Sequence, residues 1–555
     1  MKKRLIISSR MKADGWKFHR LFVILLCWVC FLPTVAQDYY YWVGLKDKQG
    51  TPHVFSKPET FLSPRAISRR ARQGIAIDST DLPVSPVYVN KLKALGLMVR
   101  DTSRWLNGVI VTAGDAHWVE LLMQQGYVRE AALIKTPLLK SVSLSKGAPR
   151  SELKSTNSEV DLYGAAYDQL SMLNGQALHD VGYKGDGMHI AVIDNGFLMV
   201  NRSTWSEGLQ ILGTRDFFSP GSNVFEGSSH GSTVLSVMAG VKSGAVKYLG
   251  AAPEAAYWLL RTEDAVSESP LEADLWVCAA EFADSAGVDV IQSSLGYFTF
   301  DDPLLNYSYA DLNGSTRISR AANMAVDKGM VVVVSAGNEG DKSWKYITVP
   351  GDAANVLSVG SVRSDLSISS FSGWGPTPDG RIKPDVVARG EGVAMILPSG
   401  HVAGYGTGTS YAAPIIGGLA ACLWQSRPQL KSHEVVDAIR ASAVRQPHWD
   451  VNRYGFGVPD FTKAWFSTQA EVAPADVHWK VWPNPFSECI NVSANGVPDH
   501  LSVLLTIYNS MGSRVWQERR ALPTVVDGLG HLGRGVYVLT IDLNHQIKTI
   551  KLIKP

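Results

Sequence analysis

The feature that most constrains this fold is the alternation, across residues 161–468, of short apolar runs with stretches of helical periodicity. The apolar runs are nearly continuous in Val and Ile, which is typical of strands buried on both faces. Strands separated by helices favour parallel pairing. Examples are the apolar runs 188–193, 288–292 and 330–334 and the helical stretches 233–239, 273–286 and 318–328. We therefore expect an α/β fold with a doubly wound, mostly parallel sheet, whose functional side chains lie at the carboxyl ends of its strands.

Three polar residues stand where such a sheet would place a functional site. Asp194 directly follows the apolar run 188–193 and precedes Asn-Gly, and His230 opens a helical stretch. Ser410 lies between a glycine-rich turn and an apolar helix, where the helix dipole favours developing negative charge. Taken singly, Asp-Asn-Gly is also typical of a turn, and a histidine at a helix start is also typical of a cap. A nucleophilic serine, however, needs a neighbouring base, and that base needs a carboxylate to orient it.

The motifs around these residues resemble those of the subtilisin-like (S8) serine peptidases. Asp194, His230 and Ser410 occur in the chain order of subtilisin. The matching motifs are Asp-Asn-Gly at 194–196, His-Gly-Ser-Thr-Val at 230–234, Ser-Ser-Leu-Gly at 293–296, Ser-Ala-Gly-Asn at 335–338 and Gly-Thr-Ser-Tyr-Ala-Ala-Pro at 408–414. The resemblance implies a subtilisin-like fold and a serine endopeptidase that works through an acyl-enzyme intermediate.

The resemblance also implies a role for each motif. Ser410 would attack the scissile carbonyl, His230 would take its proton, and Asp194 would orient the imidazole. Asn338 would donate its side-chain amide to the oxyanion. The substrate-binding segment would consist of Ser294, Leu295 and Gly296, which would pair with an extended peptide as an added strand.

Three positions depart from the family pattern. Asn195 stands where the family usually has Thr or Ser, Arg389 where it usually has Pro, and Thr407 where Ser is common. None of these changes removes a catalytic group. Asn195 directly follows Asp194, so it bears on how that carboxylate is positioned.

The N-terminal part predicts an export signal followed by a separate unit. Residues 1–36 combine a basic start, the apolar run 21–32 and a small-residue pattern that ends at Ala36. The run is shorter than the ~18 residues that a spanning helix needs, so we expect a cleaved signal peptide rather than a membrane anchor. Residues 37–134 predict a small α+β unit, and the polar stretch 135–160 predicts an exposed linker. The unit resembles the propeptides of secreted subtilisin-like peptidases; the alternative is a permanent accessory domain.

A helix is predicted over residues 63–73, with Arg65, Arg69 and Arg72 on one face. Such an arginine run could be a processing site. We interpret it instead as a solvated helix face.

The C-terminal part predicts a small antiparallel β-sandwich. After a linker at 469–475, residues 476–555 alternate apolar and polar positions between turn residues. The opening Val-Trp-Pro-Asn-Pro-Phe at 481–486, the Gly-Val-Tyr-Val-Leu at 535–539 and the basic tail resemble a type IX secretion sorting domain. This resemblance implies passage across a Bacteroidota outer membrane to the cell surface or the medium. The alternative is an ordinary adhesive β-domain.

Composition excludes several other functions. The formal charge is +2, from 53 basic and 51 acidic residues, so neither nucleic acid nor an anionic membrane is expected as a partner. Cys278 and Cys422 stand in apolar helical contexts and are predicted to be inert core thiols. No metal site is predicted and no cofactor is required; calcium stays open, since the scattered Asp residues form no calcium loop. Protein or peptide substrates, the type IX machinery as a partner and a monomeric state are expected.

Three alternatives to an active subtilisin-like peptidase follow from the same residues. One is a sedolisin-type peptidase with a Glu base, against which the motif at His230 argues. Another is a catalytically impaired protein that binds peptides at the surface. The third is an adhesion protein whose β-domain is the functional part.

Overall fold

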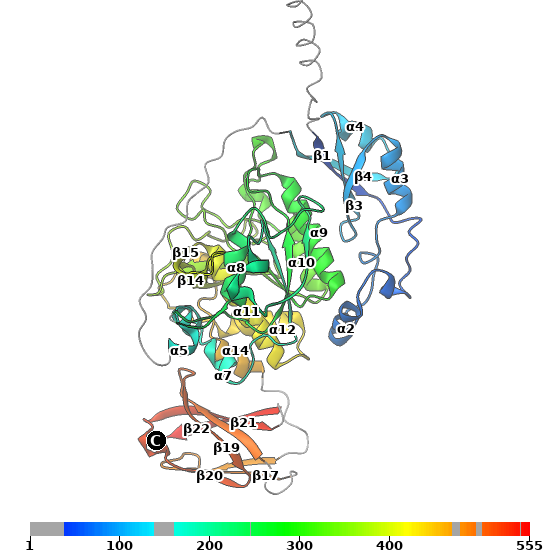
Figure 1. Cartoon of the computed structure of the whole chain (residues 1–555). Helices are drawn as coiled ribbons and strands as arrows, with labels where there is room; N and C mark the ends of the chain where they lie inside the picture. The colour runs from blue at the N-terminus through cyan, green and yellow to red at the C-terminus, as the bar shows by residue number, and fades with distance from the viewer. Residues whose placement is uncertain (1–37, 138–159, 245, 469–477, 496–501, 544–545) are drawn as a thin grey trace, which may run out of the picture.

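The structure is a computed structural model that describes residues 38–137, 160–244, 246–468, 478–495, 502–543 and 546–555. The predicted signal peptide (1–36), the linker 469–475 and most of the linker 135–160 lie outside the described residues. Figure 1 shows three units along the chain: an N-terminal unit in blue, a central unit from cyan to yellow and a C-terminal unit in red. Among the described residues, no helix is both long and apolar enough to cross a bilayer.

The central unit contains a seven-stranded sheet in the order β13-β12-β11-β10-β5-β9-β6. All neighbouring strands in it are parallel. Its strands are β5 (His189–Asp194), β6 (Gln210–Asp216), β9 (Ala256–Arg261), β10 (Val290–Ser293), β11 (Val331–Ser335), β12 (Leu357–Val362) and β13 (Val386–Arg389). The predicted parallel α/β sheet is confirmed.

Helices cover both faces of this sheet. The main ones are α8 (His230–Ala239) and α11 (Thr409–Ser426) on one face, and α9 (Pro270–Ala286) and α10 (Arg317–Asp327) on the other. Along β11, Val331 and Val333 pack with the first pair of helices, whereas Val332 and Val334 pack with the second pair. Alternate side chains of a strand point to opposite faces, so a strand between two helical layers is apolar at nearly every position.

Smaller elements complete the central unit. They are α5 (Val160–Tyr163), α6 (Tyr167–Ser171), α7 (Gln176–Asp180), α12 (Ser432–Ser442), α13 (Val451–Tyr454), α14 (Phe461–Thr468) and the hairpins β7 (Val241–Lys242) with β8 (Tyr248–Leu249) and β14 (Glu391–Ile396) with β15 (Val402–Thr407).

Cys278 in α9 and Cys422 in α11 are both buried, as predicted, and burial raises the pKa of each thiol.

The N-terminal unit contains an antiparallel four-stranded sheet in the order β2-β3-β1-β4. Its elements are β1 (Tyr39–Leu45), α2 (Pro64–Gln73), α3 (Pro86–Ala94), β2 (Met98–Ser103), β3 (Gly108–Ala113), α4 (Trp118–Met123) and β4 (Val128–Lys135). One face of the sheet packs on α9 of the central unit, where Trp42, Trp105 and Ile110 join the same hydrophobic cluster as the helix. Figure 1 shows α2 apart from this sheet.

The prediction of a solvated arginine face on α2 is wrong. Arg69 and its neighbour Arg70 are 1% exposed, and Arg65 pairs with Asp289 of the central unit. Arg72, the third residue of the predicted face, is exposed and makes no such contact with the described part of the chain. This face is buried because α2 packs against α9, whose Asp284 carboxylate neutralises the guanidinium groups of Arg69 and Arg70.

The C-terminal unit consists of two antiparallel sheets that enclose one hydrophobic core. The first sheet has the order β16-β17-β20 and the second β19-β18-β21-β22. The strands are β16 (His478–Trp482), β17 (Ile490–Asn495), β18 (Ser502–Tyr508), β19 (Arg514–Ala521), β20 (Thr524–Val526), β21 (Gly535–Leu543) and β22 (Gln546–Lys554). Tyr508 packs edge-on against Trp465 and Phe466 of α14, so this unit contacts the central one through aromatic rings.

Candidate active site

Three of the sequence motifs meet at the carboxyl edge of the central sheet. Asp194 is the last residue of β5, Ser293 the last of β10, and Ser335 the last of β11. The neighbouring strands β5 and β10 pair Ile193 with Ser293, which brings the ends of these two motifs side by side. Helices α8 and α11 begin at the other two motifs, at His230 and Thr409.

Asp194 and His230 form a partly buried hydrogen-bonded pair. His230 Nδ1 donates to Asp194 Oδ1 at 2.8 Å, and the Asn195 backbone N–H donates to the same oxygen at 2.8 Å. Asp194 is fully buried, whereas the His230 side chain is 30% exposed. An ionised carboxylate only accepts hydrogen bonds, so Nδ1 carries the hydrogen and Nε2 is left to accept a proton.

The charge on Asp194 favours a protonated His230. Burial disfavours the imidazolium, but the Asp194 carboxylate and its hydrogen bond outweigh burial, with a smaller contribution from Glu263, and raise the pKa of His230. The pair can therefore hold a proton taken from a neighbouring group, which is what a general base requires.

Ser410 lies in the first turn of α11, directly after Gly408 and Thr409. Gly408 has φ +146, a value that favours glycine, and lets the chain enter the helix from β15. The Ser410 hydroxyl donates to the Ser294 backbone oxygen at 3.3 Å. Within the described residues it does not bond His230, so proton transfer requires the hydroxyl to turn toward Nε2.

A proline in α11 explains how the Ser410 backbone is held. Pro414 has no N–H, so the carbonyl oxygen of Ser410, four residues earlier, lacks its usual helical partner. Ser294 Oγ donates to that oxygen at 2.7 Å, and Gln292 Nε2 donates to Ser294 Oγ at 2.8 Å. The serine motif and the predicted substrate-binding segment are thus joined directly.

Asn338 is oriented by the residue before Ser410. Its Oδ1 accepts from the Thr409 backbone N–H at 2.9 Å and from Thr409 Oγ1 at 3.0 Å. A backbone amide can only donate, so the oxygen of the Asn338 side chain must face Thr409, and Nδ2 is the group left to donate elsewhere.

The segment from Ser294 to Gly296 is fixed at both ends. Ser294 is tied to α11, and Tyr297 exchanges two backbone hydrogen bonds with Val349, at 3.0 and 3.1 Å. A Cβ on Gly296 would lie 2.0 Å from Thr348 Oγ1, so only glycine fits there. Leu295, between Ser294 and Gly296, is 7% exposed.

Sequence reasoning missed a buried carboxyl group beside the histidine. Glu263 follows β9, and burial raises its pKa to about 7, with Asp194 as a further cause. The Tyr297 hydroxyl donates to Glu263 Oε1, which links the segment after β9 to the segment after β10. The signal in the sequence was a glutamate two residues beyond an apolar strand of the central sheet, at its carboxyl edge.

Arg261 connects the aspartate turn to this neighbouring segment. Its Nε donates to the backbone oxygens of Asn195 and Glu263, both at 3.1 Å, and its Nη1 pairs with Asp216 at 2.9 Å. The Asn195 side-chain oxygen is buried and has no hydrogen-bond partner among the described residues. The turn is therefore held through its backbone rather than through the side chain that departs from the family pattern.

The described residues contain no group of three or more His, Cys, Asp or Glu side chains suited to a metal ion. Calcium binding therefore rests on the resemblance alone.

Comparison with known families matches all three units. Residues 185–457 match Peptidase S8, the subtilase family. Residues 40–151 match the Peptidase S8 propeptide domain of Bacteroidota, and residues 480–555 match the secretion system C-terminal sorting domain.

Individual relatives match the central part of the chain. Subtilisin of Bacillus pumilus is 30% identical over 277 residues, which cover 49% of this chain and 90% of the relative. Subtilisin E of Bacillus subtilis (strain 168) is also 30% identical over 277 residues, but the match spans 65% of that relative. Among solved structures, MycP1 from Mycobacterium smegmatis aligns with a TM-score of 0.45 at 23% identity, over 56% of this chain and 86% of its own. On the match to the Bacillus pumilus enzyme and the family match, the chain belongs to the subtilase family.

Proposed function

We propose that this protein is an exported serine endopeptidase that hydrolyses peptide bonds in proteins or peptides. Asp194, His230 and Ser410 are its catalytic triad. The observation that carries the proposal is their convergence at one sheet edge: the Asp194–His230 hydrogen bond lies beside the strand end that binds Ser410. This is the arrangement that a serine nucleophile needs.

Acylation begins when the Ser410 hydroxyl turns from the Ser294 carbonyl toward His230. Oγ attacks the scissile carbonyl carbon while His230 Nε2 takes the hydroxyl proton. Asn338 Nδ2 and the Ser410 backbone N–H, which has no intrahelical partner in the first turn of α11, donate to the oxyanion. Nε2 then passes its proton to the leaving nitrogen, the C–N bond breaks, and the acyl group stays on Oγ.

Deacylation repeats these steps with water as the nucleophile. Water attacks the acyl carbon, His230 takes one of its protons, and the proton returns to Ser410 Oγ as the carboxylic acid leaves. Asp194 keeps Nδ1 protonated throughout and offsets the imidazolium charge.

The proposed substrate-binding segment is Ser294, Leu295 and Gly296. Its support is the fixed backbone at both ends and the direct bond from Ser294 to the serine-bearing helix. An extended peptide that adds as a strand would place its carbonyl carbon beside Ser410.

The outer units supply folding, inhibition and export in this proposal. The N-terminal unit assists folding and covers the cleft until it leaves the central unit. Supporting this, Lys135 at the end of β4 bonds Ser267 Oγ at 3.0 Å, in the loop after β9. The C-terminal unit is recognised by the type IX machinery, and the enzyme acts outside the cell as a monomer.

Hydrolysis of a peptide library by the mature protein tests this proposal. Products identified by mass spectrometry should show internal cleavage, and Ser410→Ala should produce none while it still binds the same peptides. If the folded wild-type protein binds peptides but cuts none of them, the protein is a peptide-binding member of the family and the proposal is wrong.

A further inference from the structure

Besides the packing of its sheet on α9, the N-terminal unit contacts the central unit in a second region, far from the proposed active-site cleft. Helix α2 and its flanks contact the loops that precede β10 and β11, at the amino edge of the sheet. The Ser63 N–H donates to Ser285 O at 2.9 Å, and Arg65 Nε donates to Gly287 O at 2.9 Å. Gln73 Nε2 donates to Gly329 O at 2.8 Å. The proposed active site lies at the opposite, carboxyl edge.

The centre of this contact is Asp284 of α9. Three guanidinium groups of the N-terminal unit converge on its carboxylate: Arg69 at 2.5 Å, Arg70 at 2.6 Å and Arg104 at 2.6 Å. Asp284 is fully buried, and the side chains of Arg69 and Arg70 are 1% exposed. Burial opposes its ionisation, but the three arginines outweigh burial and lower the pKa of Asp284.

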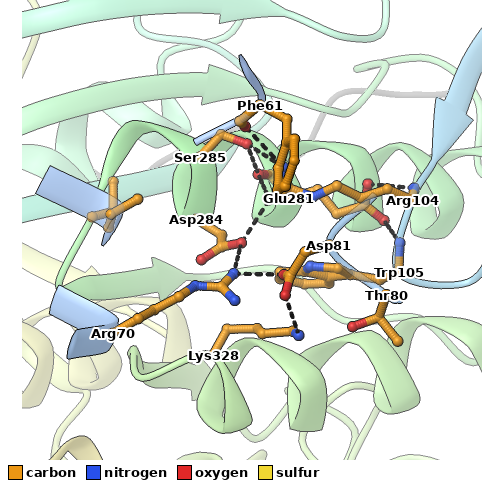
Figure 2. A network of polar contacts seen from close by, with 12 residues as sticks. Phe61, Arg70, Thr80, Asp81, Arg104, Trp105, Glu281, Asp284, Ser285 and Lys328 are labelled. Carbon is orange, nitrogen blue, oxygen red and sulfur yellow. Dashed lines mark hydrogen bonds and ion pairs between the residues drawn. The ribbon is translucent and has the colours of Figure 1, made fainter. Parts of the chain in front are cut away.

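In a second set of ion pairs the central unit supplies the positive charge and the N-terminal unit the negative charge. Lys328 of the central unit is buried and lies 3.1 Å from both Asp78 and Asp81 of the N-terminal unit. Arg70 joins the two sets of ion pairs because it pairs with Asp81 at 2.8 Å as well as with Asp284 (Figure 2). Each unit thus buries charges of both signs against the other. We call these seven residues the Asp284 cluster: Asp78, Asp81, Arg69, Arg70, Arg104, Asp284 and Lys328.

Charge pairs buried in this way discriminate between partners. Arginine presents a planar fork that a carboxylate accepts with high geometric selectivity. Removing one member of a buried pair leaves the other charged and unpaired, and the loss is expressed mainly in the dissociation rate. A partner without correctly placed arginines would leave Asp284 and Lys328 unsatisfied.

Resting on the proposed function, we propose that the Asp284 cluster keeps the N-terminal unit bound after the chain is cut between it and the central unit. On the central unit, the surface around Asp284 and Lys328 is a docking site for an arginine-bearing helix, and its occupant is α2. The sheet packed on α9 and the α2 contact act as two linked binding sites. While one of these contacts is formed, the other can open and re-form as an intramolecular step, at a high effective concentration. Inhibition therefore outlasts the cut.

The test uses the full chain with Ser410→Ala and a recognition sequence for a site-specific protease placed between residues 140 and 158. After the added protease has cut the chain, size-exclusion chromatography follows loss of the N-terminal unit over time and dilution. Arg70→Ala deletes the ion pairs to both Asp284 and Asp81, while Asp284 keeps Arg69 and Arg104 and Asp81 keeps Lys328, so loss should accelerate by at least about 10-fold. Arg72→Ala, an exposed arginine on the same helix, is the matched control and should behave as the parent chain. Equal retention in Arg70→Ala and in the control would overturn the proposal.

A second measurement keeps the cluster intact, in case Arg70→Ala does not fold. In the cut parent chain, amide hydrogen exchange over Pro64–Gln73 should stay as slow as in the uncut chain. Fast exchange there, with the β1–β4 sheet still protected, would show that α2 is released by the cut. Neither readout needs catalysis, so failure of this proposal and failure of the peptidase proposal are separate results.

Discussion

Replacing Asn338 by alanine should remove one of the two proposed oxyanion donors and leave the proposed nucleophile and base in place. The backbone N–H and the hydroxyl of Thr409 both donate to Asn338 Oδ1, so Nδ2 is directed away from Thr409 before any substrate binds. A preorganised donor of this kind is worth about 10²–10³ in kcat, or about 2.7–4 kcal/mol; the magnitude was measured in subtilisin, a member of the same family. Because Nδ2 bonds the oxygen fully only when it is charged, the loss should fall on kcat, with KM changed by no more than a few-fold.

Steady-state kinetics on one fluorogenic peptide, with wild type and Asn338→Ala, measures this effect. The buried Thr409 amide loses its acceptor in the variant, at a cost of about 1–3 kcal/mol in stability, so thermal unfolding must be recorded for both proteins. Thr409→Ser keeps both donors to Asn338 and is the matched control, with kcat expected close to wild type. A folded Asn338→Ala with near-normal kcat would refute the oxyanion hole and leave Asn338 as a turn residue after β11.

Three further predictions concern maturation, export and pH. If maturation is self-cleavage, Ser410→Ala should accumulate as an uncut precursor on denaturing gels, whereas normal processing would assign the cut to another protease. Deletion of residues 475–555 should leave peptide hydrolysis by the isolated protein unchanged but stop its passage across the outer membrane; fractionation that finds normal surface or medium levels would contradict the sorting role. Ionised Glu263 raises the pKa of His230, so Glu263→Gln should lower that pKa and move the acid limb of the kcat/KM profile to lower pH, because neutral His230 is the active base. Gln keeps an acceptor for Tyr297, and an unmoved acid limb would show that Glu263 does not influence the histidine.

The sequence was sufficient to predict the central fold because its signal is redundant. Strands such as β11 are apolar up to their last residue, since helices cover both faces, and few other folds produce this pattern. The motif residues were placed correctly at the carboxyl edge because parallel strands end at one edge of a sheet.

The pattern of residues within one segment was not sufficient to predict contacts between segments that lie far apart in the chain. The arginines of α2 looked solvated, because helical spacing shows which side chains share a face but not what that face contacts. Their partner Asp284 lies more than 200 residues later in the chain. Glu263 and Tyr297 were missed for the same reason, since their hydrogen bond joins two segments that are each unremarkable in sequence.

Covalent labelling by a fluorophosphonate probe tests the central claim most directly, because the probe reacts with a serine only when a base activates it and an oxyanion hole stabilises the adduct. Peptide mapping of the labelled mature protein should find a single adduct, on Ser410, that is absent in Ser410→Ala and forms much more slowly in His230→Ala. A folded mature protein that takes no label, or takes it on a different serine, would contradict the assignment of Ser410 as the nucleophile.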